Sequence, residues 1–528
     1  FSLFKKKPAT EGRAKPREPT VKSRFQVEPL IAVTRGQIIK KYTIDQALVT
    51  ISENNGRGYY IISEPPLNAE EKQVYSLLME NLYFSLKPIV EVKDPLKYVE
   101  SFIWEAAEEL GLVDRVQRSL PKYRYYIARD AFGYGPIHVP MMDPDIEEIS
   151  CTGVGKPVTV IHRHLTEFDW LDTNIVFESE DTLRVFVQRL AQRVGKSVTV
   201  ATPFTDAITR EGHRIAITFA DEVTLPGSTF AIRKFPEEPL SIAHIIKYGT
   251  LTPLMAAYLW LIAEHKGYII VLGGMGTGKT TLLNCILTML PPTVKIATIE
   301  DTPEIKIPHK NWQRFKSRAA YGGMEGARYE VTLFDLVKLS LRYRPDYISV
   351  GEARGEEIVA LNQAALLGHG SFTTFHAESP EAALQRMRNP PLNVPEGNLM
   401  HISCFVQLAR ITTPEGKRIR RAVELTEVVP GERLRLNKLF EWEPRTDSFH
   451  PDDPAEVVER SVRLTTVMKL TGMTSEEIYR ELDARAKLLA KLVEEGKLSY
   501  QEFSEAVLKY HVERREALAV RPGQVQTA

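Results

Sequence analysis

The chain has 528 residues, and its 68 basic side chains balance 68 acidic ones, so the formal net charge is zero. At about 150 residues per domain, this length predicts three or four structural units and excludes a single small fold. Hydrophobic residues make up 43% and charged residues 26%, a composition that excludes global disorder. The balanced charge does not favour a polyanionic partner, so only a local basic patch could bind one.

The three cysteines, Cys151, Cys285 and Cys404, lie far apart in the sequence, and none belongs to a CxxC pair. This spacing predicts neither a zinc module nor a secreted disulfide scaffold, and it favours a reducing compartment. The most apolar stretch, residues 251–274, is interrupted by charged side chains near its centre. We therefore expect neither a membrane-spanning helix nor a signal peptide.

The first three segments differ in composition. Residues 1–24 carry eight basic and two acidic side chains, which predicts a basic flexible arm that either contacts an anionic membrane surface or is a solvated tail. Residues 25–122 show apolar side chains at helical spacing, most clearly over 68–120, and predict a mostly helical N-terminal domain. Residues 123–235 alternate short β-rich runs with one helix over 181–194, which predicts a small α+β domain.

Two prolines predict a linker over residues 236–240. Apolar runs that alternate with helical segments follow over 241–430 and predict an α/β domain with a parallel sheet. Four of these runs, each ending directly in polar residues or glycine, cover residues 268–272, 295–299, 347–350 and 371–375. Because ligands bind beyond the carboxyl ends of such strands, we expect the four motifs to share one crevice. Helical periodicity and charge predict a C-terminal helical region over 431–528.

Residues 273–280 read GGMGTGKT and fit the phosphate-binding pattern GxxxxGK[ST] between an apolar strand and a helix. Glycines let backbone N–H groups surround the phosphates, and the helix N-terminus adds the positive end of its dipole. Lys279 is expected to reach the β- and γ-phosphates, and Thr280 to bind Mg²⁺. The expected nucleotide-binding residues are Gly273, Gly274, Met275, Gly276, Thr277, Gly278, Lys279, Thr280 and Thr281.

Carboxylates follow the second and third runs. Glu300, Asp301 and Glu304 lie within five residues, where a carboxylate can hold metal-bound water or accept a proton from the attacking water. Glu352 follows Gly351, which stands where a Walker B motif usually has aspartate, so Glu352 is expected to carry the magnesium contact. The expected Mg²⁺ residues are thus Thr280, Glu352 and Glu300.

Two histidines flank the fourth run. His376 follows it directly, and a donor placed there beside the γ-phosphate can report whether that phosphate is present. His369 precedes the same run and is the weaker candidate.

The blocks at residues 273–280, 300–304, 346–352 and 368–376 resemble, in this order, the Walker A motif, aspartate box, Walker B motif and histidine box of the secretion ATPase superfamily. That superfamily drives type II secretion and the assembly of type IV pili and archaella. Upstream motifs extend the resemblance over residues 125–430. No four-cysteine zinc module is present in the sequence, unlike in bacterial type II secretion motors. The chain is most similar to the archaeal branch, in particular to the archaellum motor ATPase.

The resemblance implies a RecA-like P-loop NTPase domain, a smaller α+β N-terminal domain, and a ring, usually a homo-hexamer, that binds ATP between these two domains. It implies that Arg210, Arg214 and Arg233 reach the phosphates, for which planar guanidinium groups are well suited. It favours Glu304 as the general base, with Glu352 as the competing candidate. His376 completes the expected catalytic set.

The resemblance also implies the function. It is that of a cytoplasmic Mg²⁺-dependent ATPase at the inner face of the cell membrane, which powers assembly, with or without rotation, of an archaellum or type IV pilus-like filament through a polytopic membrane platform protein. The alternatives are type II secretion-like export, a DNA-transfer or nucleic-acid translocase, and a nucleotide-gated scaffold with little turnover. The balanced charge and the lack of a recognisable groove-binding motif argue against nucleic acid as a partner.

Overall fold

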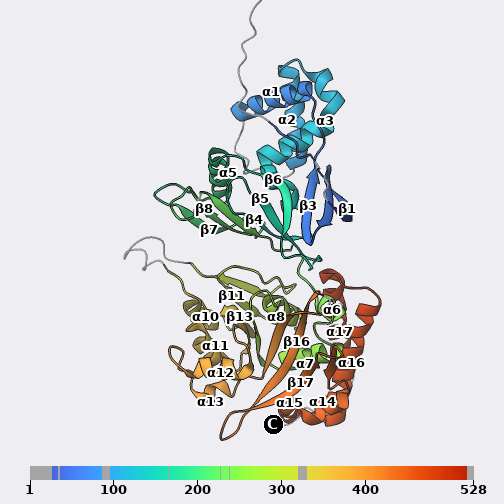
Figure 1. Cartoon of the computed structure of the whole chain (residues 1–528). Helices are drawn as coiled ribbons and strands as arrows, with labels where there is room; N and C mark the ends of the chain where they lie inside the picture. The colour runs from blue at the N-terminus through green and yellow to red at the C-terminus, as the bar shows by residue number, and fades with distance from the viewer. Residues whose placement is uncertain are drawn as a thin grey trace, which may run out of the picture. The chain divides into compact units, whose positions relative to one another are not determined.

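The computed structural model describes residues 27–31, 33, 36–85, 95–165, 167–225, 227–236, 238–318, 330–414 and 416–519 (Figure 1). The expected arm at residues 1–24 lies outside this set. The chain forms two compact units, and the second comprises Leu165–Glu167, Asp206–Ile215 and everything from Arg233 onward. Within the described part of the chain, no helix is both long and apolar enough to cross a membrane.

The first unit is built on a nine-stranded sheet with the order β1-β2-β3-β6-β5-β4-β9-β8-β7. Its strands are β1 (Gln37–Ile44), β2 (Ala47–Asn54), β3 (Arg57–Ser63), β4 (Ile146–Cys151), β5 (Pro157–His162), β6 (Leu171–Val176), β7 (Phe204–Ile208), β8 (Arg214–Thr218) and β9 (Thr229–Arg233). Its helices are α1 (Ala69–Ser85), α2 (Pro95–Glu109), α3 (Val113–Ile127), α4 (His138–Met142) and α5 (Glu180–Arg193). Short π and 3₁₀ turns, Ala128–Phe132 and Gly135–Ile137, join α3 to α4.

The expectation of a mostly helical domain over 25–122 is wrong for residues 37–63, which form an antiparallel meander. Its second turn is Asn55–Gly56, with φ angles of 53° and 76°, the left-handed geometry that tight hairpins require. Strand β3 then pairs in parallel with β6. The meander therefore shares one sheet with the α+β segment, and the boundary expected at 122/123 does not separate two sheets.

The second unit has its own nine-stranded sheet, in the order β12-β11-β13-β14-β10-β15-β16-β17-β18. Strands β12 to β15 of this order run parallel, and β16 to β18 continue antiparallel. The strands are β10 (Tyr268–Gly273), β11 (Ile296–Glu300), β12 (Trp312–Lys316), β13 (Tyr347–Ala353), β14 (Gly370–Phe375), β15 (Cys404–Thr412), β16 (Arg418–Val429), β17 (Arg435–Glu443) and β18 (Ser448–His450). The predicted α/β fold is confirmed, and the four predicted runs are the adjacent strands β11, β13, β14 and β10.

Helices cover both faces of this sheet. Along β10, Ile269 and Val271 belong to one apolar core and Ile270 and Leu272 to the other, because alternate side chains of a strand point to opposite faces. The first core is closed by α6 (Ile242–Lys247), α7 (Pro253–Glu264), α8 (Lys279–Thr288), α14 (Pro454–Arg460), α15 (Val462–Thr471), α16 (Ser475–Glu494) and α17 (Tyr500–Ala519). The second is closed by α10 (Leu333–Leu341), α11 (Glu357–Leu366), α12 (Pro380–Arg388) and α13 (Glu396–Leu399).

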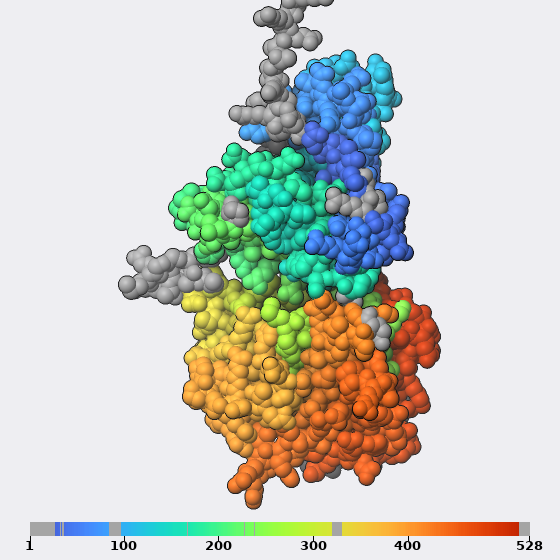
Figure 2. All heavy atoms as spheres, viewed as in Figure 1, coloured from blue at the N-terminus to red at the C-terminus, as the bar shows by residue number. Residues whose placement is uncertain are grey.

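We expected the C-terminal region to be helical from residue 431, and this is wrong. Strands β17 and β18 first extend the sheet. Helices begin only at Pro454 and form part of the surface of the second unit, red in Figure 2. The hydroxyl of Thr474 accepts a hydrogen bond from Glu477 N and caps α16, as its sequence indicates.

A buried charge cluster joins α16 and α17 to α7 of the same unit. Arg485 of α16 is fully buried, and its guanidinium bonds to Glu264 of α7 at 2.5 Å and to Glu481 at 2.7 Å. Arg514 of α17 pairs with the same two carboxylates. Trp260 of α7 lies against Arg485, 5.2 Å from its ring centroid to the guanidinium carbon. Buried charges are tolerated because each has partners of opposite sign.

We expect Arg485→Ala to lower the free energy of unfolding by about 3 kcal/mol, because it leaves buried carboxylates without their guanidinium partner. The matched control is Arg480→Ala on the same helix, since Arg480 is 68% exposed and pairs with the exposed Glu476. An exposed pair of this kind contributes less than about 0.5 kcal/mol. Urea unfolding of both variants measures this difference. Equally small losses of unfolding free energy in the two variants would show that the buried charge cluster does not stabilise the fold.

Candidate nucleotide-hydrolysis site

The phosphate loop connects β10 to α8, and two of its glycines are required by geometry. A Cβ at Gly273 would lie 2.5 Å from the carbonyl oxygen of Leu408 on the neighbouring strand. Gly278 has a φ of 93° and caps α8 in the left-handed conformation, which other residues rarely adopt. The loop therefore curls tightly at the carboxyl edge of the sheet, where its amides can face a phosphate.

Lys279 spans this loop. Its ammonium donates a hydrogen bond to the carbonyl of Gly274 at 2.6 Å, and the Thr277 hydroxyl donates to the same oxygen at 3.0 Å. Burial lowers the pKa of Lys279, whereas the nearby charge of Glu352 raises it. The lysine is thus held over the loop by a carbonyl contact that a phosphate can replace.

Glu300 has a different role from the magnesium contact expected from the sequence. Its side chain is buried, and Oε1 accepts hydrogen bonds from the backbone N–H groups of Glu304 at 2.8 Å and Ile305 at 2.9 Å. Burial raises the pKa of Glu300 to about 7. This carboxyl group fixes the segment that carries Glu304.

The same side chain explains the unusual Walker B sequence. A Cβ at Gly351 would lie 3.0 Å from Cγ of Glu300, so a side chain there would press on the buried glutamate. An aspartate at position 351 would displace Glu300 from the two amides that it accepts. The acidic group of this strand is therefore carried one residue further on, by Glu352.

Glu304 lies beside the phosphate loop, where the Thr280 side chain acts to lower the pKa of its carboxyl group. Burial raises the pKa of Glu304, partly offset by the charges of Arg233 and Arg214. The segment is further tied to α8, because Asn284 Oδ1 accepts a hydrogen bond from Lys306 N at 2.9 Å. Glu304 is thus a half-buried carboxylate, held at a defined place, with a raised affinity for a proton.

Glu352 joins the third and fourth strands. Its Oε1 lies 2.7 Å from Nε2 of His376, and its Oε2 accepts a hydrogen bond from Arg354 at 2.6 Å. Burial alone would raise the pKa of Glu352, but Arg354, His376 and Lys279 together hold it below its usual value. Glu352 therefore holds a proton less tightly than an ordinary glutamate, whereas Glu304 holds one more tightly.

His369 does not belong to this group. Its Nδ1 lies 2.8 Å from the carbonyl of Pro345, and it precedes β14, so it sits at the amino edge of the parallel sheet. His369, the weaker candidate of the two histidines, therefore lies away from the edge where Glu352 and His376 meet. Because a strand separates the two histidines of this motif, only His376 reaches the carboxyl edge.

The three sequence-predicted arginines belong to the same compact unit as the phosphate loop. Arg214 pairs with Asp206, with its Nε 3.1 Å from Oδ1, and its charge also acts on Glu304. Arg233 is exposed, and its charge acts on both Lys279 and Glu304. Arg210 is exposed in the turn between β7 and β8.

Sequence reasoning missed three residues that shape the site. Arg354 pairs with Glu352, Asn284 ties the Glu304 segment to α8, and Arg420 donates from Nε to the carbonyl of Gly276 at 3.0 Å. The position of Arg354, two residues after Glu352, was the one available signal. Arg420 lies 144 residues from Gly276, and only the sheet topology brings them together.

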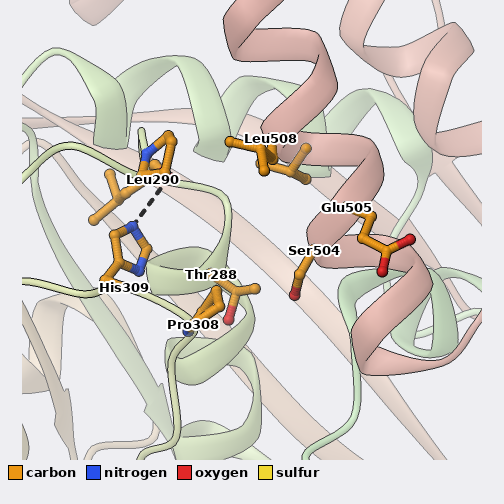
Figure 3. Close-up of a pocket in the computed structure, with 9 residues that line it drawn as sticks. Thr288, Leu290, Pro308, His309, Ser504, Glu505 and Leu508 are labelled. Atoms are coloured by element: carbon orange, nitrogen blue, oxygen red, sulfur yellow. Dashed lines mark hydrogen bonds between the residues drawn. The ribbon is translucent and has the colours of Figure 1, made fainter.

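Helix α17 contacts the segments that follow both nucleotide motifs. His511 donates to the carbonyl of Met289 just after α8, at 3.1 Å, and Tyr500 donates to the carbonyl of Lys306, also at 3.1 Å. Between these elements lies an apolar cavity of about 150 Å³, shown in Figure 3. Its lining includes Thr288, Leu290, Pro308, His309, Ser504 and Leu508.

Residues 160–445 match the family model described as type II/IV secretion system protein, which is more than half of the chain. The chain belongs to this family. The secretion ATPase is thus an ATP hydrolase with a nucleotide-binding P-loop domain. Helices α14 to α17 lie beyond the matched residues.

Its relatives include an uncharacterized protein of Methanocaldococcus jannaschii, MJ0900, which is 33% identical over 491 residues, 87% of this chain and 86% of the relative. A Mycobacterium tuberculosis protein named for conjugal transfer is 33% identical over 221 residues, covering 41% of this chain and 62% of that protein. Among solved structures, the pilus retraction motor PilT with bound ADP is 21% identical, with a TM-score of 0.38, covering 68% of this chain and 93% of PilT. The Legionella pneumophila ATPase DotB is 16% identical, with a TM-score of 0.42, covering 71% and 94%.

The buried carboxyl of Glu300 predicts a pH effect on stability. Its pKa of about 7 in the folded chain exceeds the ordinary 4.5, so the folded state binds the proton more tightly and the wild type loses stability as pH rises between these values. Glu300→Gln keeps an acceptor for both loop amides and has no charge to bury. Relative to the wild type, we expect it to gain on the order of 2 kcal/mol between about pH 5 and pH 8.

Thermal unfolding at several pH values measures this difference. Glu356→Gln is the control, because Glu356 is an exposed glutamate that follows the neighbouring strand β13, and it should follow the wild type throughout. Parallel pH curves for Glu300→Gln and the wild type would show that Glu300 is not a buried acid.

Proposed function

We propose that this secretion ATPase is a Mg²⁺-dependent motor that converts ATP hydrolysis into mechanical work on a membrane-bound filament assembly of the archaellum or type IV pilus kind. The observation that carries the proposal is the convergence of Lys279, Thr280, Glu304 and Glu352 at one carboxyl edge. One basic group, one hydroxyl and two carboxylates of opposite pKa shift provide the parts that phosphoryl transfer to water needs.

The chemistry follows from these residues. The loop amides and the Lys279 ammonium hold the β- and γ-phosphates and stabilise the charge that develops on them. Glu304 accepts the proton of the attacking water, a role supported by its raised pKa and by the amide bonds through Glu300 that fix its segment. No covalent intermediate is needed, because a positioned water attacks the γ-phosphate in line.

The donor set fits magnesium. Mg²⁺ prefers hard oxygen ligands and takes only one or two of them from protein beside substrate phosphates. The Thr280 hydroxyl and the ionised Glu352 supply such oxygens, whereas the Glu300 carboxyl is occupied with backbone amides. When bound, the ion neutralises charge on the β- and γ-oxygens.

His376 and the arginines complete the proposal. His376 donates toward the γ-phosphate, and its contact with Glu352 links that phosphate to β13. The phosphates are proposed to contact Arg233, Arg214 and Arg210. For Arg233 and Arg214 this is supported by their charges, which lower the pKa of the nearby Glu304. Guanidinium groups remain charged under all physiological conditions and pair with two phosphate oxygens at once.

The assembly belongs to the same proposal. A homo-hexameric ring on the cytoplasmic side of the membrane acts on a polytopic platform protein, with residues 1–24 attracted to anionic lipid. A DNA-transfer ATPase is the second candidate, favoured by the relative named for conjugal transfer and disfavoured by the zero net charge. Deletion of the gene distinguishes them, since loss of swimming or adhesion supports the filament and loss of DNA transfer supports the second candidate.

Lys279→Ala is expected to reduce steady-state ATP hydrolysis to background and to weaken ATP binding at least tenfold, because a charge-assisted contact to the phosphates is lost. A phosphate-release assay and nucleotide titration measure both effects. Near-normal turnover in this variant would rule out the proposed phosphate loop.

The variant Glu304→Gln distinguishes the role of Glu304 from that of Glu352. Because glutamine keeps the shape but cannot accept the proton, kcat should fall at least a hundredfold while the Kd of MgATP stays within about threefold. Glu352→Gln should instead raise the Mg²⁺ concentration needed for half-maximal rate. Normal turnover in Glu304→Gln would transfer the base role to Glu352.

A further inference from the structure

Two arginines of the β15–β16 hairpin lie beside the phosphate loop. Arg410 and Arg420 are directly opposite each other in the antiparallel pairing. A Cβ at Gly276 would lie 3.9 Å from Nη1 of Arg410, and a Cβ at Gly278 would lie 3.8 Å from Cδ of Arg420. Together with the bond from Arg420 to the Gly276 carbonyl, these distances put both arginine side chains next to the phosphate loop, on the side of the β15–β16 hairpin.

This pair is costly for the hairpin. Like charges directly opposite on neighbouring strands destabilise a sheet. Within the part of the chain that the structure describes, the side chain of Arg410 forms no ion pair or hydrogen bond, and it is exposed. The adjacent Arg421, by contrast, is buried and bonds to Asp447 at 2.7 Å. An anionic ligand at the phosphate loop would relieve the repulsion.

The topology indicates which part of a nucleotide reaches this side. Strands β11, β13 and β14 lie on one side of β10, and β15 and β16 lie on the other. Glu352 is part of β13, and Glu304 and His376 follow β11 and β14. A nucleotide whose γ-phosphate meets the carboxylates therefore extends its α-phosphate and nucleoside toward the hairpin. Met275, an apolar residue of the loop that is 83% exposed, lies next to Gly276 in the chain.

We propose that Arg410 and Arg420 bind the nucleoside end of ADP and ATP, pairing with the α-phosphate and stacking on the base. Guanidinium groups suit both contacts, because they pair with phosphate oxygens in a planar fork and stack on aromatic faces. The two residues contribute to nucleotide affinity. The rate of hydrolysis depends on the carboxylates and His376 on the opposite side of β10. The inference rests on the proposed function, since a nucleotide must occupy the phosphate loop.

The test compares ADP and ATP binding with turnover in the full chain. In Arg410→Ala, the Kd of both nucleotides should rise about tenfold and by the same factor, whereas kcat at saturating ATP stays within twofold. Arg410→Lys keeps the charge but cannot stack, so it should recover only part of the affinity. Arg435→Ala on β17 is the matched control, because Arg435 is exposed on the same sheet and should bind as the wild type does.

Two results would overturn the inference. An unchanged Kd for ADP in Arg410→Ala would show that this residue does not touch the nucleoside end. A loss confined to ATP would assign it to the γ-phosphate. Both differ from failure of the proposed function, in which the wild-type chain itself neither binds ADP nor hydrolyses ATP.

Discussion

The buried carboxyl of Glu300 is the contact on which the arrangement of this site depends. It ends β11, takes two backbone amides of the next segment, and so determines where Glu304 stands relative to Thr280. The same group fills the space above Gly351 and moves the acidic residue of β13 to position 352. One desolvated side chain thereby sets the positions of both carboxylates that we propose to act on the nucleotide.

The sequence predicted four parallel strands of the second unit, β10, β11, β13 and β14, because long apolar runs ending in glycine or charge have few other interpretations. It could not assign Glu300, since a burial of this kind depends on a neighbour 51 residues away, and an acidic side chain after a strand looks the same whether it meets metal or backbone. The meander at 37–63 was missed because apolar spacing further along favoured helices, and its Asn55–Gly56 turn was overlooked. Arg420 reaches Gly276 only through sheet order, which local pattern does not encode.

Helix α17 connects the C-terminal region to two segments that follow the residues of the candidate site. Helix α17 bonds to the chain just after α8 and just after the Glu304 segment, so a shift of either segment relative to the other must change its contacts. The apolar pocket beside these contacts is lined by residues of α8, of the segment after Glu304 and of α17, so all three elements meet there. The proposed motor thus has a route by which the state of the phosphates can reach its outer helices.

Helix α7 lies within the residues that match the family model, but it is buried partly by helices that lie beyond them. Every side chain from Leu254 to Ala263 is buried, because the sheet packs on one side of the helix and α16 on another. A chain ended at residue 445, where the family match stops, would lose α16 and turn this apolar cylinder toward water. Helices α14 to α17, which lie beyond the family match, therefore belong to the apolar core of the second unit and cover a face that water would otherwise reach.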